Sequence, residues 1–168
     1  LLTLRVPIPA QLFAKPEAPV LLEKELAAPG YEPRMIAIGT NTDPYQPIER
    51  ERKIMRGILE VLERTGHPVG IVTKSALVVR DIDILARMAK RNLAKVAISV
   101  TSLDPKLART MEPRAATPPK RLEALRQLSA AGIPATVMVA PVIPALNDSE
   151  IERILDAAAH AGVREASY

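Results

Sequence analysis

The 168 residues of this sequence include no cysteine. That absence excludes disulfide bonds and every metal site that needs a thiolate ligand from these residues. Aromatic side chains are also scarce, with one phenylalanine, three tyrosines and no tryptophan, so a surface for stacking nucleic-acid bases is not expected. No apolar run approaches the ~18 residues that a membrane-spanning helix needs, and prolines interrupt the apolar N-terminal segment. We therefore expect a cytoplasmic protein that does not enter a membrane.

The composition that remains is ordinary for a folded soluble domain. Hydrophobic residues make up 48% of the chain and charged residues 25%, and the length suits one domain, although it is short for a closed eight-stranded α/β barrel. The formal net charge is +4 and the isoelectric point is about 9.6. Because the cations are spread along the chain, this excess is compatible with nucleic acid or an anionic substrate but requires neither.

Four short apolar runs alternate with longer amphipathic segments. The runs are rich in β-branched residues, which is typical of parallel strands buried on both faces. They span residues 34–40, 68–74, 95–102 and 135–143. The amphipathic segments carry apolar residues at helical spacing, and they span residues 48–64, 80–92, 118–132 and 149–162. This alternation predicts an α/β fold of βα units, and the last five residues, REASY, look like the start of one more strand.

Polar clusters come directly after each predicted strand. In parallel α/β folds the carboxyl ends of the strands share one edge, and ligands bind there. The clusters are TNTDPYQP at 40–47, Lys74 with Ser75, the segment 101–104, and APVIPALND at 140–148. We therefore expect the clusters to lie along one rim and to form the functional site.

Several of these motifs resemble those of one enzyme family. The segments TNTDPYQPIE, GIVTKS and MEPRAATP, and the stretch from SVTSLD to PVIPALND, are similar to sequences of the radical S-adenosylmethionine (radical SAM) superfamily. Within it they resemble the branch of spore photoproduct lyase. The resemblance covers residues 12–168 and leaves residues 1–11 unmatched. It implies a partial parallel (β/α) barrel of the TIM-barrel-like type, truncated at both ends, with cofactor and cluster at the carboxyl rim.

The resemblance also implies a chemistry. Members of the family hold a [4Fe-4S] cluster through a CxxxCxxC loop, cleave S-adenosylmethionine and generate a 5′-deoxyadenosyl radical. Because this chain has no cysteine, we expect it to be inactive alone and an intact parent protein to be the enzyme. The branch suggests a lyase that repairs DNA, which makes nucleic acid a candidate partner. The sequence itself does not define the substrate.

The resemblance assigns cofactor binding to nine residues: Thr40, Asn41, Asp43, Lys74, Ser99, Glu112, Arg114, Ala140 and Val142. The first three would accept hydrogen bonds from the methionine ammonium of S-adenosylmethionine. They would alternatively form an Asx-type turn that caps the next helix. Lys74 would contact the carboxylate or ribose side of the cofactor.

The remaining assignments come from the later strands. Ser99 is expected to point into the barrel, on the alternation of the strand that contains it. Glu112 and Arg114 would grip the charges of cofactor and substrate, or alternatively pair with each other. Ala140 and Val142 would offer backbone and apolar contact to adenine. The sequence assigns no catalytic residue and no metal ligand within this chain.

Two other functions fit the sequence. The chain would be a non-catalytic (β/α) module that binds a nucleotide or a partner, or it would be a Schiff-base aldolase that uses Lys74 at the end of its strand. A truncated sheet also exposes backbone edges, and exposed edges recruit strands. We therefore expect either that residues 1–6 pair with the sheet or that the protein self-associates through an edge.

Overall fold

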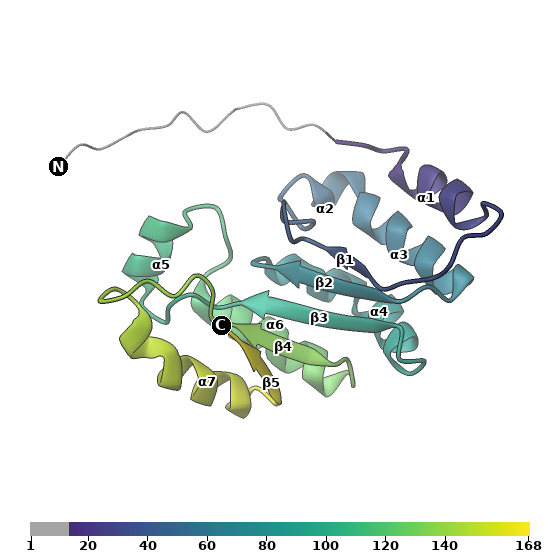
Figure 1. The fold of residues 1–168 in the computed structure, drawn as a ribbon. Helices are drawn as coiled ribbons and strands as arrows, with labels where there is room; N and C mark the ends of the chain where they lie inside the picture. The colour runs from purple at the N-terminus through teal and green to yellow at the C-terminus, as the bar shows by residue number, and fades with distance from the viewer. Residues whose placement is uncertain (1–13) are drawn as a thin grey trace.

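The computed structural model describes residues 14–168, and its centre is a sheet of five parallel strands (Figure 1). The strands are β1 (Ile36–Ile38), β2 (Val69–Thr73), β3 (Ala94–Ser99), β4 (Ala135–Met138) and β5 (Glu165–Ser167), side by side in the order of the chain. This sheet confirms the predicted partial (β/α) barrel, including the last strand. The unmatched segment 1–11 and the predicted pairing of residues 1–6 lie outside the described residues.

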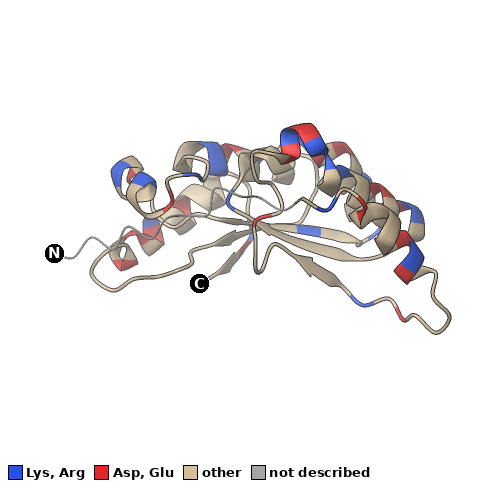
Figure 2. Ribbon diagram, turned by 90° about the horizontal axis from the view of Figure 1, so that it is seen from above, with Lys and Arg blue, Asp and Glu red and all other residues tan. Residues whose placement is uncertain are grey.

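Helices connect the strands and cover one face of the sheet. They are α1 (Ala18–Leu26), α2 (Glu49–Arg52), α3 (Ile54–Thr65), α4 (Ile82–Ala89), α5 (Pro105–Met111), α6 (Pro118–Ala130) and α7 (Ile151–His160), with short 3₁₀ turns η1 (Ala76–Asp81) and η2 (Asp148–Glu150). Figure 2 shows the helices on one side of the strands, while the other side of the described chain is bare. Within residues 14–168, none of these helices is long and apolar enough to cross a membrane.

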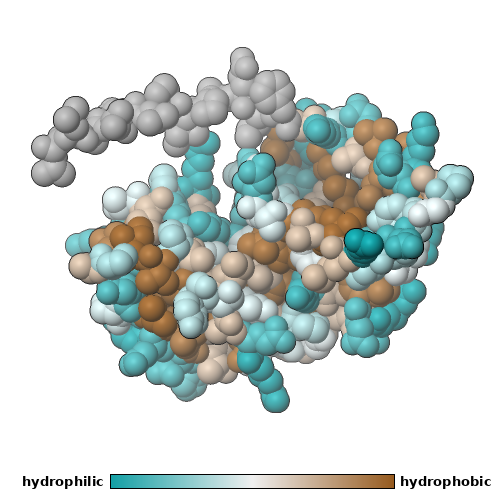
Figure 3. Space-filling view, in the orientation of Figure 1, coloured by the Kyte–Doolittle hydropathy of each residue, from teal (hydrophilic) through white to brown (hydrophobic). Residues whose placement is uncertain are grey.

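Because helices pack on only one face of the sheet, successive residues of a strand alternate between buried and more exposed positions. In β3, Val96 is fully buried beneath the helices, whereas its neighbour Lys95 is exposed on the bare face. The register continues this bare row across the sheet, where Ala97 lies between Val72 and Thr136. The expected burial on both faces is therefore wrong for the described residues, because no helix of theirs covers the second face. Figure 3 views this face and shows apolar and polar side chains mixed across it.

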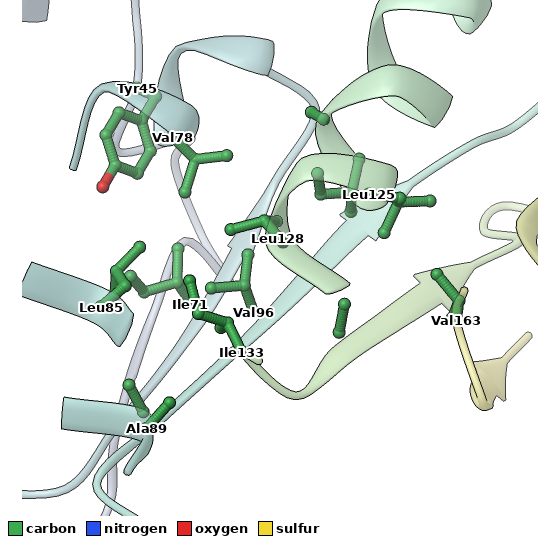
Figure 4. Close-up of a cluster of buried hydrophobic side chains, with 14 of the residues drawn as sticks. Tyr45, Ile71, Val78, Leu85, Ala89, Val96, Leu125, Leu128, Ile133 and Val163 are labelled. Carbon is green, nitrogen blue, oxygen red and sulfur yellow. The ribbon is translucent and has the colours of Figure 1, made fainter. Parts of the chain in front are cut away.

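The core lies between the sheet and the helices. Helix α3 directs Leu59 and Leu62 into it, α6 directs Leu125 and Leu128, and all four side chains are fully buried. Figure 4 shows Leu128 close to Val96 of the central strand. Each buried leucine contributes roughly 1.5 to 3 kcal/mol relative to an exposed one, so these stripes hold the helices on the sheet.

The single helix predicted over residues 48–64 is broken at Lys53, whose φ of 51° is left-handed and separates α2 from α3. The first backbone N–H groups of a helix have no partner within it. Here the buried carboxylate of Glu49 accepts hydrogen bonds from the N–H groups of Ile54 (3.0 Å) and Met55 (2.9 Å). The periodicity did not reveal the break, because the apolar spacing continues through it.

The sequence pattern also did not predict α1 and α5. Helix α1 has no buried residue and packs on α3, where Pro19 lies next to Gly57. Helix α5 has one buried residue, Ala108, and its start is capped by the carboxylate of Asp104, which accepts from the Lys106 N–H at 2.8 Å. Both helices are short, and α1 turns only the partly buried Leu22 and Leu26 toward the core, which is too brief a repeat for a periodicity argument.

Candidate functional site

The candidate site lies at the carboxyl edge of the sheet, to which the strand arrows point in Figure 1. The loop after β1, the turn after β2 and the loop 112–117 between α5 and α6 meet there. Gly39 allows the first loop to approach β2: its φ is 98°, and a Cβ atom at this position would collide with the carbonyl oxygen of Val72. The loop 112–117 reaches the same place, because the Ala116 N–H donates to the carbonyl of Lys74 at 3.3 Å.

Asp43 joins the first two of these segments. One carboxylate oxygen accepts from the backbone N–H of Tyr45 (2.9 Å) and from the hydroxyl of Thr73 (2.7 Å), and the other accepts from the backbone N–H of Lys74 (2.8 Å). The bond to Tyr45 is the Asx-type turn that the sequence allowed, although it lies before α2 rather than capping it. Both oxygens of the predicted cofactor ligand therefore already serve internal donors.

Glu112 joins the second and third segments. Its Oε1 lies 2.6 Å from the Nζ of Lys74, and its Oε2 accepts from the guanidinium of Arg121 at 2.5 Å. Burial raises the pKa of Glu112, but the hydrogen bonds from Lys74 and Arg121 outweigh it, so the pKa lies below its ordinary value of 4.5. The alternative pair between Glu112 and Arg114 is not formed. Instead, Glu112 carries a negative charge that holds Lys74 at the rim.

Arg121 is a site residue that the sequence analysis missed. Its side chain is 2% exposed, and it also donates to the carbonyls of Ala116 (2.7 Å) and Ser99 (2.8 Å). It thereby ties the loop 112–117 to the end of β3. One signal was available: Arg121 stands three and four positions before Ala124 and Leu125, in the buried stripe of α6. A charge in such a stripe indicates a buried polar contact.

The buried side chain of Tyr45 anchors the loop after β1 to the protein interior. Its ring is 2% exposed, and its hydroxyl donates to the carboxylate of Asp81 at 3.1 Å. Burial, followed by the nearby Asp81 charge, raises the pKa of Tyr45 far above its ordinary range. Arg80 neutralises Asp81 and also donates to Glu49 (2.9 Å), while Figure 4 shows Tyr45 beside Val78 of the apolar cluster. Tyr45 is thus an anchor of the loop, and its hydroxyl is turned away from the rim.

The other predicted site residues lie elsewhere along the edge. Ser99 follows Lys95 and Ala97 on the bare face, as expected, but it is 3% exposed and its hydroxyl donates to the carbonyl of Ala140 at 3.0 Å. Val142 is half-buried against the core. Ala140 and Val142 lie in the loop after β4. The buried Asn147 holds this loop, because it donates to the carbonyl of Pro141 and accepts from the Ile143 N–H. Thr40 and Asn41 are exposed at the start of the first loop.

A cavity of about 590 Å³ opens between the three joined segments. Four of the nine predicted residues line it, namely Asp43, Lys74, Glu112 and Arg114. The other five, Thr40, Asn41, Ser99, Ala140 and Val142, lie outside it. The structure therefore divides the predicted residues between the cavity and its surroundings.

The five parallel strands, their bare face and the polar rim define a partial (β/α) barrel with a cavity at its carboxyl edge. The sequence model of the radical SAM superfamily matches residues 8–158, and the chain belongs to this superfamily. The finer assignment to the branch of spore photoproduct lyase does not follow from this match.

Curated relatives match most of the chain. The uncharacterized protein Rv2578c of Mycobacterium tuberculosis is 38% identical over 154 residues, which are 90% of this chain and 45% of that protein. The uncharacterized protein MJ0683 of Methanocaldococcus jannaschii is 31% identical over 115 residues, which are 68% of this chain and 43% of that protein. The chain thus spans less than half the length of either relative.

Solved structures share the fold. Streptococcus suis SuiB bound to its precursor peptide SuiA superposes with a TM-score of 0.63 and 15% identity, over 93% of this chain and 33% of that chain. SuiB bound to S-adenosylmethionine superposes with a TM-score of 0.58 and 15% identity, over 79% of this chain and 28% of that chain. At this identity the likeness establishes the partial barrel and nothing about the ligand.

The cofactors of the superfamily fit this chain unequally. A [4Fe-4S] cluster needs thiolate ligands, which the chain lacks, and residues 14–168 bring together no group of three His, Asp or Glu side chains that would hold a metal. The cluster does not fit these residues. S-adenosylmethionine fits better, because Thr40 and Asn41 present side-chain oxygens that the described residues leave without hydrogen bonds, and the side chain of Lys74 at the same edge of the sheet is 39% exposed.

Proposed function

We propose that this chain forms the S-adenosylmethionine-binding rim of a radical SAM enzyme whose [4Fe-4S] cluster is held by cysteines outside these 168 residues. One observation carries the proposal: Asp43 and Glu112 lock three sequence-distant segments together at the carboxyl edge. Such locking holds ligand-binding groups in place before the ligand arrives, which reduces the entropic cost of binding. In this superfamily the cofactor supplies a radical that removes hydrogen from a substrate.

The residues of this chain would divide the work of binding. Thr40 and Asn41 would accept hydrogen bonds from the ammonium of the cofactor, since hydroxyl and amide oxygens suit that group. Lys74 would pair with the cofactor carboxylate, and Glu112 would orient Lys74 for this contact. Ser99, Ala140 and Val142 would lie beside the nucleoside part, as the motif resemblance implies.

The finer proposal concerns the reaction. On the resemblance of TNTDPYQPIE, GIVTKS and MEPRAATP alone, we propose a lyase of the spore photoproduct lyase type that acts on nucleic acid. The relatives that match the chain are themselves uncharacterized, so the substrate rests on these motifs.

The test uses the complete polypeptide that carries these residues, reconstituted without oxygen with iron and sulfide. We expect iron at the stoichiometry of one [4Fe-4S] cluster and release of 5′-deoxyadenosine from S-adenosylmethionine on reduction. Lys74→Ala should weaken cofactor binding by roughly 1 to 3 kcal/mol. Lys90→Ala, at the exposed end of α4, is the matched control and should not. A polypeptide that takes up no cluster would contradict the proposed enzyme activity.

Two alternatives remain open to experiment. A non-catalytic binding module is favoured by the absence of cysteine, and it predicts cofactor or partner binding without 5′-deoxyadenosine in the same assay. A Schiff-base aldolase needs a neutral lysine, whereas the Nζ of Lys74 lies 2.6 Å from the carboxylate of Glu112. Borohydride treatment with a carbonyl substrate would trap an adduct on Lys74 if that reaction occurred.

A further inference from the structure

The cavity of about 590 Å³ is lined by more cationic side chains than its carboxylates neutralise. Its charged lining residues are Asp43, Arg50, Lys74, Glu112, Arg114 and Lys120. Asp43 is occupied by three donors, and Glu112 by Lys74 and Arg121. Arg50, Arg114 and Lys120 are exposed, and within residues 14–168 none of their side chains forms a salt bridge or hydrogen bond. The cavity therefore carries a positive charge that the described residues do not neutralise.

The three cations approach the cavity from separate parts of the fold. Arg50 lies on α2, Arg114 lies in the loop between α5 and α6, and Lys120 lies in the first turn of α6. The loop 112–117 that carries Arg114 is fixed, because Arg121 donates to the Ala116 carbonyl. Cations that surround a space from several directions suit an anion with several acceptor oxygens.

The charge of S-adenosylmethionine does not complement the excess positive charge of the cavity. The molecule has a sulfonium, an ammonium and one carboxylate, so it carries a net positive charge at neutral pH. Lys74 alone can satisfy its carboxylate, and further cations would repel the remainder. The unpaired cations suit a ligand of the opposite charge better.

We propose that the cavity binds the phosphate group of a second ligand, through Arg50, Arg114 and Lys120. A phosphate monoester carries nearly two negative charges and three acceptor oxygens, which match several cations, whereas a monocarboxylate would neutralise one. The hydroxyls of Ser75 and Thr117 also line the cavity and can donate to phosphate oxygens. A volume of about 590 Å³ is in the range of small-molecule sites, so the phosphate can belong to a ligand of nucleotide size.

A second cavity continues the same surface. It has a volume of about 300 Å³, shares the lining loop 112–117 with the first cavity, and is also lined by Lys106 and Arg109 of α5. Residues 14–168 offer neither cation a salt bridge. The phosphate group can thus come from a mononucleotide held in the first cavity or from a longer strand whose phosphates pass both cavities.

The test measures binding to the 168-residue protein by isothermal titration calorimetry at low ionic strength. The probes are inorganic phosphate, AMP and an oligothymidylate of about eight nucleotides, a length typical of single-strand sites, with acetate as a monocarboxylate control. The double variant Arg114→Ala/Lys120→Ala removes two charges from the cavity. Its matched control, Lys90→Ala/Arg153→Ala, removes two exposed charges that do not line either cavity. All four side chains are exposed, so both variants should fold.

We expect saturable binding of at least one phosphate probe, about tenfold weaker in the cavity variant and unchanged in the control variant. Binding of phosphate or AMP at one per chain identifies a small phosphorylated ligand. Binding of the oligonucleotide alone, further weakened by Lys106→Ala, identifies a nucleic-acid backbone. Absence of saturable binding by all three probes, acetate binding as tight as phosphate, or equal loss in both double variants would overturn the proposal. No cofactor enters this assay, so its outcome is independent of the proposed enzyme activity.

Discussion

At the scale of the residue, the rim depends on two carboxylates whose partners are distant in sequence. The motifs identified Asp43 and Glu112 but not their contacts, because Thr73, Lys74 and Arg121 reach them only after the strands have paired. A local pattern predicts an Asx turn, since its two groups are two residues apart. It does not predict a hydrogen bond that the tertiary fold creates. Arg121 is the instructive exception, because its place in an apolar stripe was visible in the sequence.

Asp43→Ala should lower the free energy of unfolding by about 2 to 3 kcal/mol, because it leaves the Thr73 hydroxyl and two backbone N–H groups without their acceptor. Asp43→Asn retains one acceptor oxygen and should cost less. Urea unfolding at pH 7 measures both. If the two variants were equally stable, Asp43 would not hold the loop as the geometry indicates.

Glu112→Gln should make the free energy of unfolding less dependent on pH in the acidic range. The pKa of Glu112 is lowered in the folded state, so its contribution is complete above its ordinary value of 4.5 and is lost as the pH falls through the folded pKa. At pH 7 the variant should be less stable by roughly 1 to 3 kcal/mol, because the buried Arg121 loses its counter-charge. Urea unfolding between pH 7 and pH 3 should show this difference shrinking below pH 4.5. Glu152→Gln, at an exposed position on α7, is the control and should leave the free energy of unfolding at pH 7 unchanged.

At the scale of the element, periodicity predicted strands and core helices because their burial repeats regularly. The runs that became β2, β3 and β4 are apolar because one face packs on helices, while residues of mixed size and polarity, such as Gly70 and Lys95, face the bare side. The break at Lys53 and the helices α1 and α5 were not predictable in this way. They depend on a single cap or on contacts between surfaces, neither of which produces a repeating pattern.

Two glycines that end elements should differ sharply in their tolerance of alanine. Gly39 and Gly132 both have positive φ, 98° and 73°, but a Cβ would strike the Val72 carbonyl at Gly39 and would meet nothing within 4 Å at Gly132. Gly132→Ala should cost about 1 kcal/mol from backbone strain alone, and Gly39→Ala should cost more than about 3 kcal/mol or prevent folding. Thermal unfolding of the two variants tests this. Similar losses would show that the loop after β1 moves freely away from β2.

At the scale of the whole molecule, the sheet has two ends and one bare face. Strands β1 and β5 each pair on one side among the described residues. The Ile36 N–H donates to the carbonyl of Pro68, directly before β2, so alternation directs the Ala37 N–H toward the free edge. Such an edge is a template for another strand, and this geometry supports the expectation of an edge partner without naming it.

Ala37→Pro should abolish pairing at this edge, because proline has no N–H to donate and leaves the bonds between β1 and β2 intact. We expect the unmodified protein either to self-associate in light scattering or to show slow hydrogen exchange at residues 1–6 and at the Ala37 N–H. The variant should be monomeric with fast exchange at 1–6. A monodisperse unmodified protein in which residues 1–6 and the Ala37 N–H exchange freely would show that the edge is tolerated without a partner.

The strand order has a consequence for biosynthesis. Ile36 pairs with Val69, Val69 with Ala94, and Val96 with Ala135, so each strand finds its partner in the strand made just before it. A chain leaving the ribosome can therefore add one βα unit at a time to an existing sheet, with no need to wait for its C-terminus. Ribosome-bound chains that end after β3 should already protect β2 from protease, which would make assembly of this barrel vectorial.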